Sequence, residues 1–404
     1  MQNHTINAPA GFLAAGDHIG IKKENKDLTL ILSEKPASAA GCFTQNIVKA
    51  APVQYDLSII KSGKTVRGIV VNSGNANACT GKQGLLDVRA TAGVFADLAC
   101  CKAEEILVCS TGVIGVALPM DILLPGIKKV YSQLGKDRAS GENAVLGIMT
   151  TDTYAKSAYE EITIGGVSVK LAGIAKGSGM IHPNMATLLA FITTDAAISA
   201  ELLQKALSAG VRDSYNMISV DRDTSTNDTA LVLANGMAGN IQIESESEEF
   251  YKFCAALNRI NKKLAIDIAR DGEGASKLME VTVHGAKTDT DARVIARSVT
   301  TSNLFKAALF GSDANWGRVL CSMGYSGGEF NPDSASVSFR SSAGAINVLK
   351  DGKPVVFDEN LAGSLLSEKE IYIDIRLTDG NSSATAWGCD LTYTYVKING
   401  EYRS

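Results

Sequence analysis

The sequence predicts an α/β or α+β protein with a β-rich C-terminal unit, and three observations lead to this fold class. Runs of β-branched and aliphatic residues alternate with helix-like stretches through about residue 300. The composition is that of a globular chain, with 45% apolar and 20% charged residues among 404. Glycine is frequent at 38 residues and proline scarce at 8, which indicates tight backbone positions rather than Pro-rich linkers.

The strands expected in the first three hundred residues share one pattern, a short apolar run bounded by small or polar residues. In chain order they are Val66–Asn72, Glu105–Cys109, Ala158–Ile164, Val167–Ile174 and Met185–Thr193. The glycine pair Gly165-Gly166 predicts a hairpin, because glycines suit its tight turn. The first two strands run into small-residue loops, SGNANACTG from Ser73 and STGVIG from Ser110.

Helices are expected at Gly84–Ala99, Leu123–Leu134, Ala200–Ser214 and Glu246–Arg270. The last begins within the acidic run ESESEE, which suits the positive end of a helix better than a cation site. The C-terminal part is richer in strands, which we expect at Ala335–Arg340, Ile371–Leu377 and Leu391–Ile398. The sequence thus predicts a main α/β body over about residues 1–300 and a β-rich unit over about residues 301–404.

The charge and hydropathy argue against several classes of protein. With 39 basic and 43 acidic residues the net charge is −4, so the chain has no basic field to hold nucleic acid. No run of 18 or more apolar residues predicts a membrane span, and the first residues lack a secretory pattern, so we expect a cytoplasmic protein. The eight cysteines show no CxxC and no framework spacing, and are expected to be buried reduced thiols.

Several familiar catalytic motifs are incomplete. The run Gly324–Gly328 (GYSGG) matches a nucleophile elbow, but that arrangement needs a later histidine, and the last of the four histidines is His284. We therefore expect a turn there. No Walker A, complete G-x-G-x-x-G or H-E-x-x-H motif occurs, and the histidines are scattered. Neither a nucleotide cofactor nor a metal is expected.

The stretch Lys176–Thr194, KGSGMIHPNMATLLAFITT, joins a glycine-containing loop to an apolar strand, and Ala186-Thr187 lies at the junction. A rigid strand would support a reactive hydroxyl, but threonine is a weak nucleophile that needs a base. His182 could supply one. Alternatively, a cut between Ala186 and Thr187 would give Thr187 a free α-amine, of unperturbed pKa roughly 7.7–8, as its own base. Spacing alone favours ordinary packing of a β-branched residue.

This stretch resembles the ornithine acetyltransferase family, also called glutamate N-acetyltransferases, the bifunctional proteins of arginine biosynthesis. Other segments match that family in the same order over essentially the whole chain. They are CFTQNIVKAAPV from Cys42, NSGNANACTG from Asn72, STGVIG from Ser110, IMTTDT from Ile148, RDGEGASK from Arg270, GSDANWGR from Gly311 and the terminal NGEYRS. Ala155 and Ala314 differ from the proline that many relatives carry, outside the segment proposed for the chemistry.

The resemblance implies a fold, a processing event and a reaction. The fold is an N-terminal-nucleophile-like α/β/β/α sandwich. The precursor cuts itself between Ala186 and Thr187 into an α chain of residues 1–186 and a β chain of residues 187–404, which stay together as α₂β₂. The enzyme transfers acetyl from N²-acetyl-L-ornithine to L-glutamate by a ping-pong mechanism through an acetyl-threonine. No cofactor is implied, although some members also accept acetyl-CoA as a donor.

The resemblance also assigns roles to particular residues. Thr187 is the nucleophile of both cleavage and transfer, and Thr111 with Gly112 forms the oxyanion hole, where donors meet the developing negative charge. His182 has no catalytic role in this interpretation. The substrate contacts are Thr150 (Thr151 if the register shifts), Lys176, Thr187, Glu273, Asn399 and Ser404. Among these, Lys176 suits a carboxylate and Glu273 suits an ammonium group.

Two other readings of the sequence stay open. One is a hydrolase of the same fold, which would release amino acids or deacetylate ornithine with water as the acceptor. The other is an uncleaved binding protein without enzymatic activity. The sequence leaves open whether acetylornithine is the only acetyl donor or acetyl-CoA is used as well. It also fits both the arginine pathway and a related secondary pathway.

Overall fold

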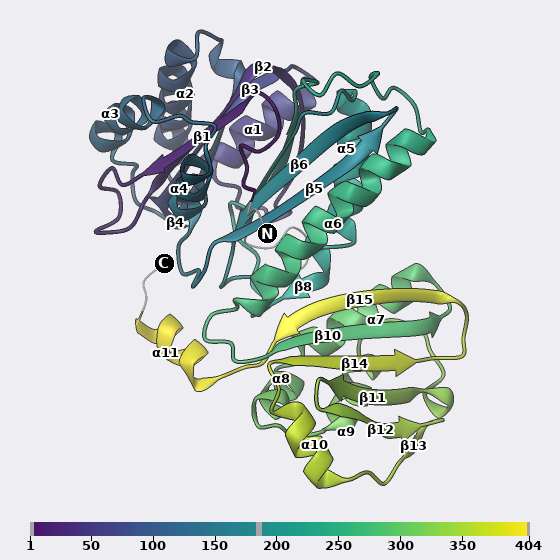
Figure 1. The fold of residues 1–404 in the computed structure, drawn as a ribbon. Coiled ribbons are helices and arrows are strands. Elements are labelled where there is room, and N and C mark those ends of the chain that lie inside the picture. Colours follow the sequence, from purple (N-terminus) through teal and green to yellow (C-terminus); the bar gives the residue numbers. More distant parts are fainter. Residues whose placement is uncertain (1–3, 183–187, 402–404) are drawn as a thin grey trace.

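The computed structural model describes residues 4–182 and 188–401. Figure 1 shows a layered α/β body with a second, strand-rich unit below it. Among the described residues, no helix is long and apolar enough to cross a membrane.

The main body is built on one long sheet that bends on itself. Its strand order is β4-β3-β2-β9-β7-β6-β5, and β1 pairs with β2 off this path. The strands are β1 (Phe12–Asp17), β2 (Leu28–Phe43), β3 (Val66–Asn75), β4 (Ile106–Val113), β5 (Lys156–Ile164), β6 (Val167–Lys176), β7 (Leu189–Thr194) and β9 (Thr229–Ala234). The pairing of β2 with β3 shifts register between Leu32 and Ala37, and β9 pairs only with the later half of β2. β2 therefore belongs to two half-sheets.

The two half-sheets pack face to face around a shared apolar core. Ile69 of β3 and Leu107 of β4 lie in the same buried cluster as Phe191 of β7 and Leu231 of β9. The alternate residue Val70 lies in a separate cluster on the other side of its sheet. This alternation follows from the two-residue period of a strand.

Helices surround the two half-sheets. They are α1 (Ala51–Lys61), α2 (Gly81–Leu98), α3 (Met120–Tyr131), α4 (Arg138–Ile148), α5 (Ala200–Arg212) and α6 (Glu248–Arg270). Residues of α2 and α3 pack on the outer face of the first half-sheet, and residues of α5 and α6 on that of the second. The α/β/β/α sandwich implied by the resemblance is thus confirmed (Figure 1).

Several local features that the sequence predicted are present in the structure. Gly165 and Gly166 have φ values of 56° and 81°, as the predicted hairpin between β5 and β6 requires. The acidic run leads into the first turn of α6, where the Ser247 side chain accepts a hydrogen bond from the Phe250 N–H. The GYSGG run begins at the last residue of α9 (Trp316–Gly324) and then forms a turn, as expected.

A second sheet forms the lower unit in Figure 1, with strand order β13-β12-β11-β14-β10-β15-β8. Its strands are β8 (Ile218–Ser219), β10 (Leu278–Ala286), β11 (Ser336–Ser341), β12 (Gly344–Lys350), β13 (Lys353–Pro354), β14 (Glu370–Arg376) and β15 (Ser382–Cys389). The helices that follow β10 are α7 (Asp289–Thr301), α8 (Asn303–Phe310), α9 (Trp316–Gly324), α10 (Glu359–Leu366) and α11 (Tyr393–Glu401). Because β10 pairs with β14 and β15, this sheet begins before the boundary expected near residue 300.

The strand predicted at Leu391–Ile398 is wrong, because α11 occupies this segment. The Thr392 hydroxyl accepts a hydrogen bond from the Tyr395 N–H, 3.2 Å away, and so begins the helix. None of the helix's residues is buried. The alternating pattern of the segment therefore has no sheet face to cover, and a helix satisfies its backbone groups internally.

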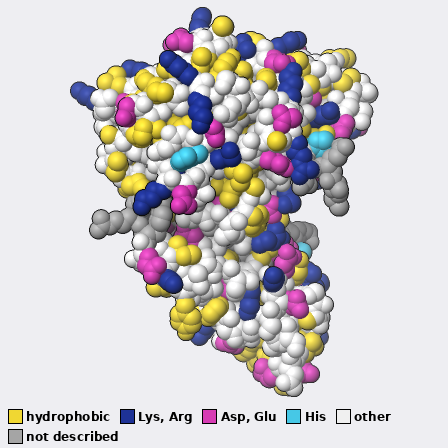
Figure 2. Space-filling view, turned by 60° about the vertical axis from the view of Figure 1, so that its left-hand side comes forward, with side chains coloured by type: hydrophobic (Ala, Val, Ile, Leu, Met, Phe, Trp, Pro, Cys, Tyr) yellow, Lys and Arg dark blue, Asp and Glu magenta, His cyan; other side chains and the backbone are white. Residues whose placement is uncertain are grey.

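Two further expectations need correction. The predicted loop Ser110–Gly115 is partly strand, because β4 continues through Val113 and pairs with β3. All eight cysteines are free, but only Cys109 and Cys389 are buried, while Cys79, Cys100 and Cys321 are exposed. On the face drawn in Figure 2, basic and acidic side chains are interspersed.

Candidate active site

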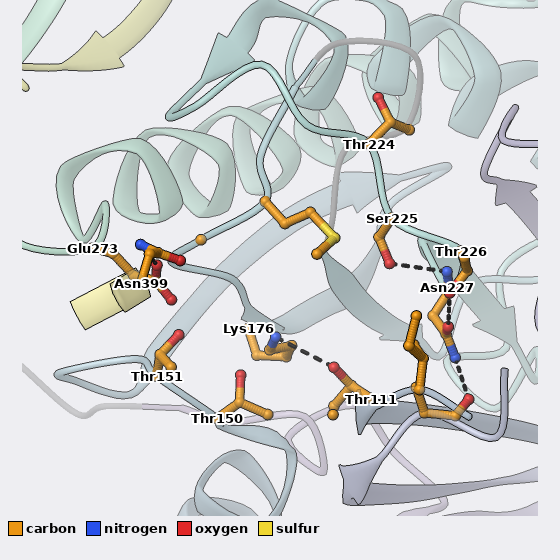
Figure 3. Close-up of a pocket in the computed structure, with 15 residues that line it drawn as sticks. Thr111, Thr150, Thr151, Lys176, Thr224, Ser225, Thr226, Asn227, Glu273 and Asn399 are labelled. Carbon is orange, nitrogen blue, oxygen red and sulfur yellow. Dashed lines mark hydrogen bonds between the residues drawn. The ribbon is translucent and has the colours of Figure 1, made fainter. Parts of the chain in front are cut away.

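A pocket of about 230 Å³ lies where the ends of β4 and β6 meet several loops. It brings together residues that are far apart in the sequence (Figure 3). The sequence-predicted residues that line it are Thr111, Gly112, Thr150, Lys176, Glu273 and Asn399, and the alternative Thr151 lines it as well. Ala186, Thr187 and Ser404 lie outside the described residues.

Thr111 and Gly112 lie near the end of β4, where its pairing with β3 becomes irregular at Gly74 and Asn75. Gly112 has a φ of 134°, and a Cβ atom there would lie 2.3 Å from the carbonyl carbon of Gly74. Only glycine fits this position, because both its conformation and its close approach to β3 exclude a side chain. The bulged strand end therefore presents its backbone to the pocket.

Lys176 is the last residue of β6, and its side chain is buried against the pocket. Its Nζ donates a hydrogen bond to the Thr111 hydroxyl at 3.4 Å (Figure 3). Burial lowers the pKa of Lys176, and the nearby Asp152 carboxylate acts in the opposite direction. The chain thus holds the Lys176 amino group in a largely dehydrated position at one side of the pocket.

Glu273 and Asn399 lie side by side on another side of the pocket (Figure 3). Asn399, from α11, donates a hydrogen bond from Nδ2 to Glu273 Oε2 at 2.9 Å. The Glu273 N–H donates to the Ser178 carbonyl at 3.0 Å. The carboxylate also rests on Gly179, where an added Cβ would lie 2.3 Å from the Glu273 carboxyl carbon. These contacts fix an acidic group on another side of the pocket from Lys176.

The segment Thr224–Asn227 also lines the pocket, and the sequence analysis missed it. Asn227 Nδ2 donates to the carbonyls of Ala76 at 2.7 Å and Ser110 at 2.8 Å. Asn227 thereby ties this segment to the ends of β3 and β4. The run DRDTSTND, rich in hydroxyl and amide side chains just before a buried strand, was the available signal.

A second, very small cavity adjoins the pocket. It is lined by Thr111, Lys176, Leu188, Leu189, Ser225, Asn227 and Asp228. Leu188 and Leu189 are the first described residues after Thr187, and the Leu188 carbonyl accepts from the Thr229 N–H at 3.0 Å. The start of β7 therefore borders the same space as Thr111 and Lys176.

Asp228 is a buried carboxyl group in this small cavity. Neither of its side-chain oxygens makes a hydrogen bond of ordinary geometry with a described residue. Burial raises the pKa of Asp228 well above its usual value, although the charge of Lys176 and the hydroxyl of Thr44 oppose the shift. Sequence reasoning gave no reason to single out this residue.

His182 does not line the pocket. Its Nδ1 lies 3.3 Å from the Ser219 hydroxyl. Burial, together with the charges of Arg297 and Arg222, lowers the pKa of His182 to about 4. A neutral imidazole outside the pocket agrees with the interpretation in which His182 has no catalytic role, which stays a prediction.

Comparison with known proteins gives full-length matches. A model of the ArgJ family matches residues 13–404. The arginine biosynthesis bifunctional protein ArgJ of Caldanaerobacter subterraneus subsp. tengcongensis is 50% identical over 399 residues, covering 99% of this chain and 98% of that protein. ArgJ 1 of Clostridium acetobutylicum is 52% identical over 405 residues, covering 100% and 98%. The crystal structure of ArgJ from Bacillus halodurans is 45% identical with a TM-score of 0.50, covering 52% of this chain and 98% of that chain.

The family match and the full-length relatives agree with the motifs that the sequence analysis identified. The fold is a mixed α/β sandwich, and the matched segments at Ser110, Ile148 and Arg270 contribute residues to one pocket. The chain belongs to the ArgJ family and is an acyltransferase of arginine biosynthesis.

Proposed function

We propose that this chain is a glutamate N-acetyltransferase that carries acetyl from N²-acetyl-L-ornithine to L-glutamate. The arrangement of charge in the pocket is the observation that carries the proposal. Lys176 places an ammonium group on one side and Glu273 a carboxylate on another, and both face the same space. An amino acid carries the complementary carboxylate and ammonium groups. The pocket, at about 230 Å³, is smaller than the roughly 300–1,000 Å³ of drug-sized ligand sites.

The proposed nucleophile is Thr187, released by self-cleavage between Ala186 and Thr187. The position is supported by Leu188 and Leu189, which border the small cavity together with Thr111 and Lys176. A cut near the middle of the chain also agrees with the Bacillus halodurans relative, whose solved chain is covered to 98% by about half of this one. The resulting chains, residues 1–186 and 187–404, would assemble as α₂β₂.

The reaction proceeds in two acyl transfers. The Thr187 hydroxyl attacks the acetyl carbonyl carbon while its free α-amine accepts the proton. The carbon–nitrogen bond breaks, and ornithine leaves with that proton, so that an acetyl-threonine ester remains. The α-amine of glutamate then attacks the ester carbon, the bond to the threonine oxygen breaks, and the oxygen regains a proton.

Thr111 and Gly112 stabilise the negative oxygen that forms in both transfers. The bulged end of β4 suits this role because it turns backbone groups toward the pocket. Aligned donors at such a position are worth roughly 10²–10³ in rate each. Thr150, Asn399 and Ser404 complete the proposed substrate contacts. The reaction needs no cofactor, since the nucleophile, the base and the hydrogen-bond donors all come from the chain. Acetyl-CoA enters only as an alternative acetyl donor.

Incubation with N²-acetyl-L-ornithine, with and without L-glutamate, tests the proposal against a hydrolase of the same fold. We expect ornithine release to depend on glutamate and to equal the N-acetylglutamate formed. Ornithine release that is indifferent to glutamate contradicts transfer. Replacing acetylornithine by acetyl-CoA in the same assay shows whether the second donor is used.

Denaturing electrophoresis with N-terminal sequencing tests the cleavage. We expect two chains, the second starting Thr-Leu-Leu, and loss of both cleavage and transfer in Thr187→Ala. The matched control is Thr163→Ala, an exposed threonine of β5 outside the pocket, which should cleave and transfer normally. One full-length band from the wild-type chain, without activity, would favour an uncleaved binding protein.

A further inference from the structure

Asp152 is a buried carboxylate that joins two of the segments around the pocket. Its Oδ2 accepts from the Thr150 N–H at 3.0 Å, and its Oδ1 accepts from the Gly177 N–H at 2.7 Å. Thr150 itself lines the pocket, and Gly177 directly follows Lys176. One side chain therefore sets the distance between the Thr150 loop and the end of β6.

Lys156 connects Asp152 to a second buried carboxylate. Its Nζ donates to Asp152 Oδ1 at 2.7 Å and to Asp271 Oδ2 at 2.5 Å, and the Lys156 side chain has no exposed surface. Asp271 also accepts from the Thr153 N–H at 3.0 Å. Because buried charges are tolerated only when paired and hydrogen-bonded, the three groups must stay together in the folded chain.

The same network reaches the acidic side of the pocket. The Ser178 hydroxyl donates to the Asp271 carbonyl at 2.6 Å, and the Glu273 N–H donates to the Ser178 carbonyl at 3.0 Å. The segments that carry Thr150, Lys176 and Glu273 are thus held by one unit of alternating charge, Asp152–Lys156–Asp271. None of these three residues lines the pocket itself.

The charges around Lys176 come from several elements. Asp152, Asp228 and Glu273 raise its pKa, whereas burial and Lys156 lower it. Lys22, from the loop before β2, also interacts with Lys176, and burial lowers the pKa of Lys22 to about 8. Asp152 provides the largest of the interactions that raise the pKa of Lys176.

We propose that Asp152 is a positioning residue for the acetyl transfer, which sets the spacing between Lys176 and Glu273 and keeps the Lys176 ammonium able to bind a substrate carboxylate. Lys156 and Asp271 hold Asp152 in this place. The inference rests on the proposed function, since it assigns the Lys176 ammonium to an amino-acid substrate.

The test compares two variants that should shift the pKa of Lys176 in opposite directions. Asp152→Asn keeps an oxygen acceptor but removes the charge, so Lys176 should lose its proton at lower pH. The double variant Lys156→Met with Asp271→Asn removes one charge of each sign and leaves Asp152 unpaired beside Lys176, so Lys176 should keep its proton to higher pH. The readout is the alkaline limb of the pH profile of kcat/KM for N²-acetyl-L-ornithine.

We expect the alkaline limb to move to lower pH in Asp152→Asn and to higher pH in the double variant, by about one unit, because a nearby opposite charge typically shifts a pKa by ~1–3 units. We also expect KM to rise about tenfold in Asp152→Asn while kcat changes less. A purely structural role predicts lost stability without opposite shifts. Repeating the profiles in a Lys22→Gln background excludes Lys22 as the titrating group.

Asp195→Asn is the matched control. Asp195 is also buried and accepts from two backbone N–H groups, those of Ala10 and Lys170, toward the other end of β6. It should leave the pH profile unchanged. The inference is overturned if the alkaline limb shifts in the same direction in both test variants, or does not shift in either. If Asp152→Asn does not fold, the double variant alone provides the test. Absence of glutamate-dependent transfer in the wild type overturns the proposed function instead.

Discussion

Several titratable side chains around the pocket are buried, and the protonation of each one depends on the groups beside it. Lys176 has the hydroxyl of Thr111 and the charge of Asp152 nearby, whereas Asp228 lacks an ordinary hydrogen bond to a described residue. A buried group without a partner favours its neutral form, because burial disfavours charge. The two residues should therefore respond to pH in different ways.

Asp228→Asn should stabilise the protein increasingly as pH rises. Burial places the folded-state pKa of Asp228 above its unfolded value of about 3.9, so the folded state loses stability as pH rises between the two. Asparagine stays neutral throughout. We expect the melting temperature of the variant, relative to wild type, to increase from pH 5 to pH 8. The difference in free energy of unfolding should grow on the order of 1 kcal/mol per pH unit while Asp228 remains protonated in the folded state. The control is Asp97→Asn, at an exposed aspartate. The prediction is contradicted if the melting temperatures of Asp228→Asn and the wild type differ by the same amount at pH 5 and pH 8.

Gly179→Ala should impair binding without unfolding the protein. An added Cβ would lie 2.3 Å from the Glu273 carboxyl carbon, so the carboxylate must leave its place beside Asn399. We expect KM for acetylornithine to rise roughly tenfold, since small misplacements of binding groups are costly. In Gly363→Ala, an open position within α10, kinetics should stay normal and stability rise by about 0.5–1 kcal/mol. Unchanged KM in Gly179→Ala argues against Glu273 as a substrate contact.

At the scale of elements, the pocket is assembled from the ends of strands and from one peripheral helix. The end of β4 brings Thr111 and Gly112, and the end of β6 brings Lys176. Both strands are buried in the sandwich, so these groups rest on rigid supports. α11 differs, because it has no buried residue and yet supplies Asn399 to the pocket.

Removal of α11 should separate folding from activity. A chain ending at Thr392 loses no buried residue of this helix, so its melting temperature should stay within a few degrees of the wild type. Glu273 loses the hydrogen bond from Asn399, and KM for acetylornithine should rise about tenfold or more. Asn399→Ala isolates this bond from the rest of the terminus. Normal kinetics in both variants would exclude the helix from the site.

For the molecule as a whole, the proposed cut falls just before a central strand. β7 pairs with β6 over Leu171–Lys176 on one side and with β9 over Thr229–Ala234 on the other. The later half of β2 pairs with β9 as well. Residues before and after the cut are therefore interleaved in one sheet and one core.

The two proposed chains should stay associated after cleavage. We expect them to elute together in size-exclusion chromatography under native conditions and to unfold in urea in a single transition, because separating them would expose paired strands and the shared core. The uncleaved Thr187→Ala protein should elute at the same volume. Elution of two separate chains in native buffer contradicts this prediction.

Patterns that are local in the sequence were sufficient for much of the fold. Hydrophobic periodicity predicted α5 and α6 closely, and Gly165-Gly166 predicted the hairpin. The same reasoning failed at Leu391–Ile398, where period-two alternation met no sheet edge. Periodicity reports which faces of a segment are apolar, but it does not report whether a partner is present to cover them.

The sequence by itself determined the family, the fold class and the pocket residues carried in its motifs. Only the tertiary structure brought Thr111, Lys176 and Glu273 around one space, added Thr224–Asn227, and paired Asp152 with Lys156 and Asp271. The physical reason is that a buried charge persists only beside its partner, and Asp271 comes from a segment far along the chain from Asp152 and Lys156. Their meeting depends on how the layers pack, which no local pattern records.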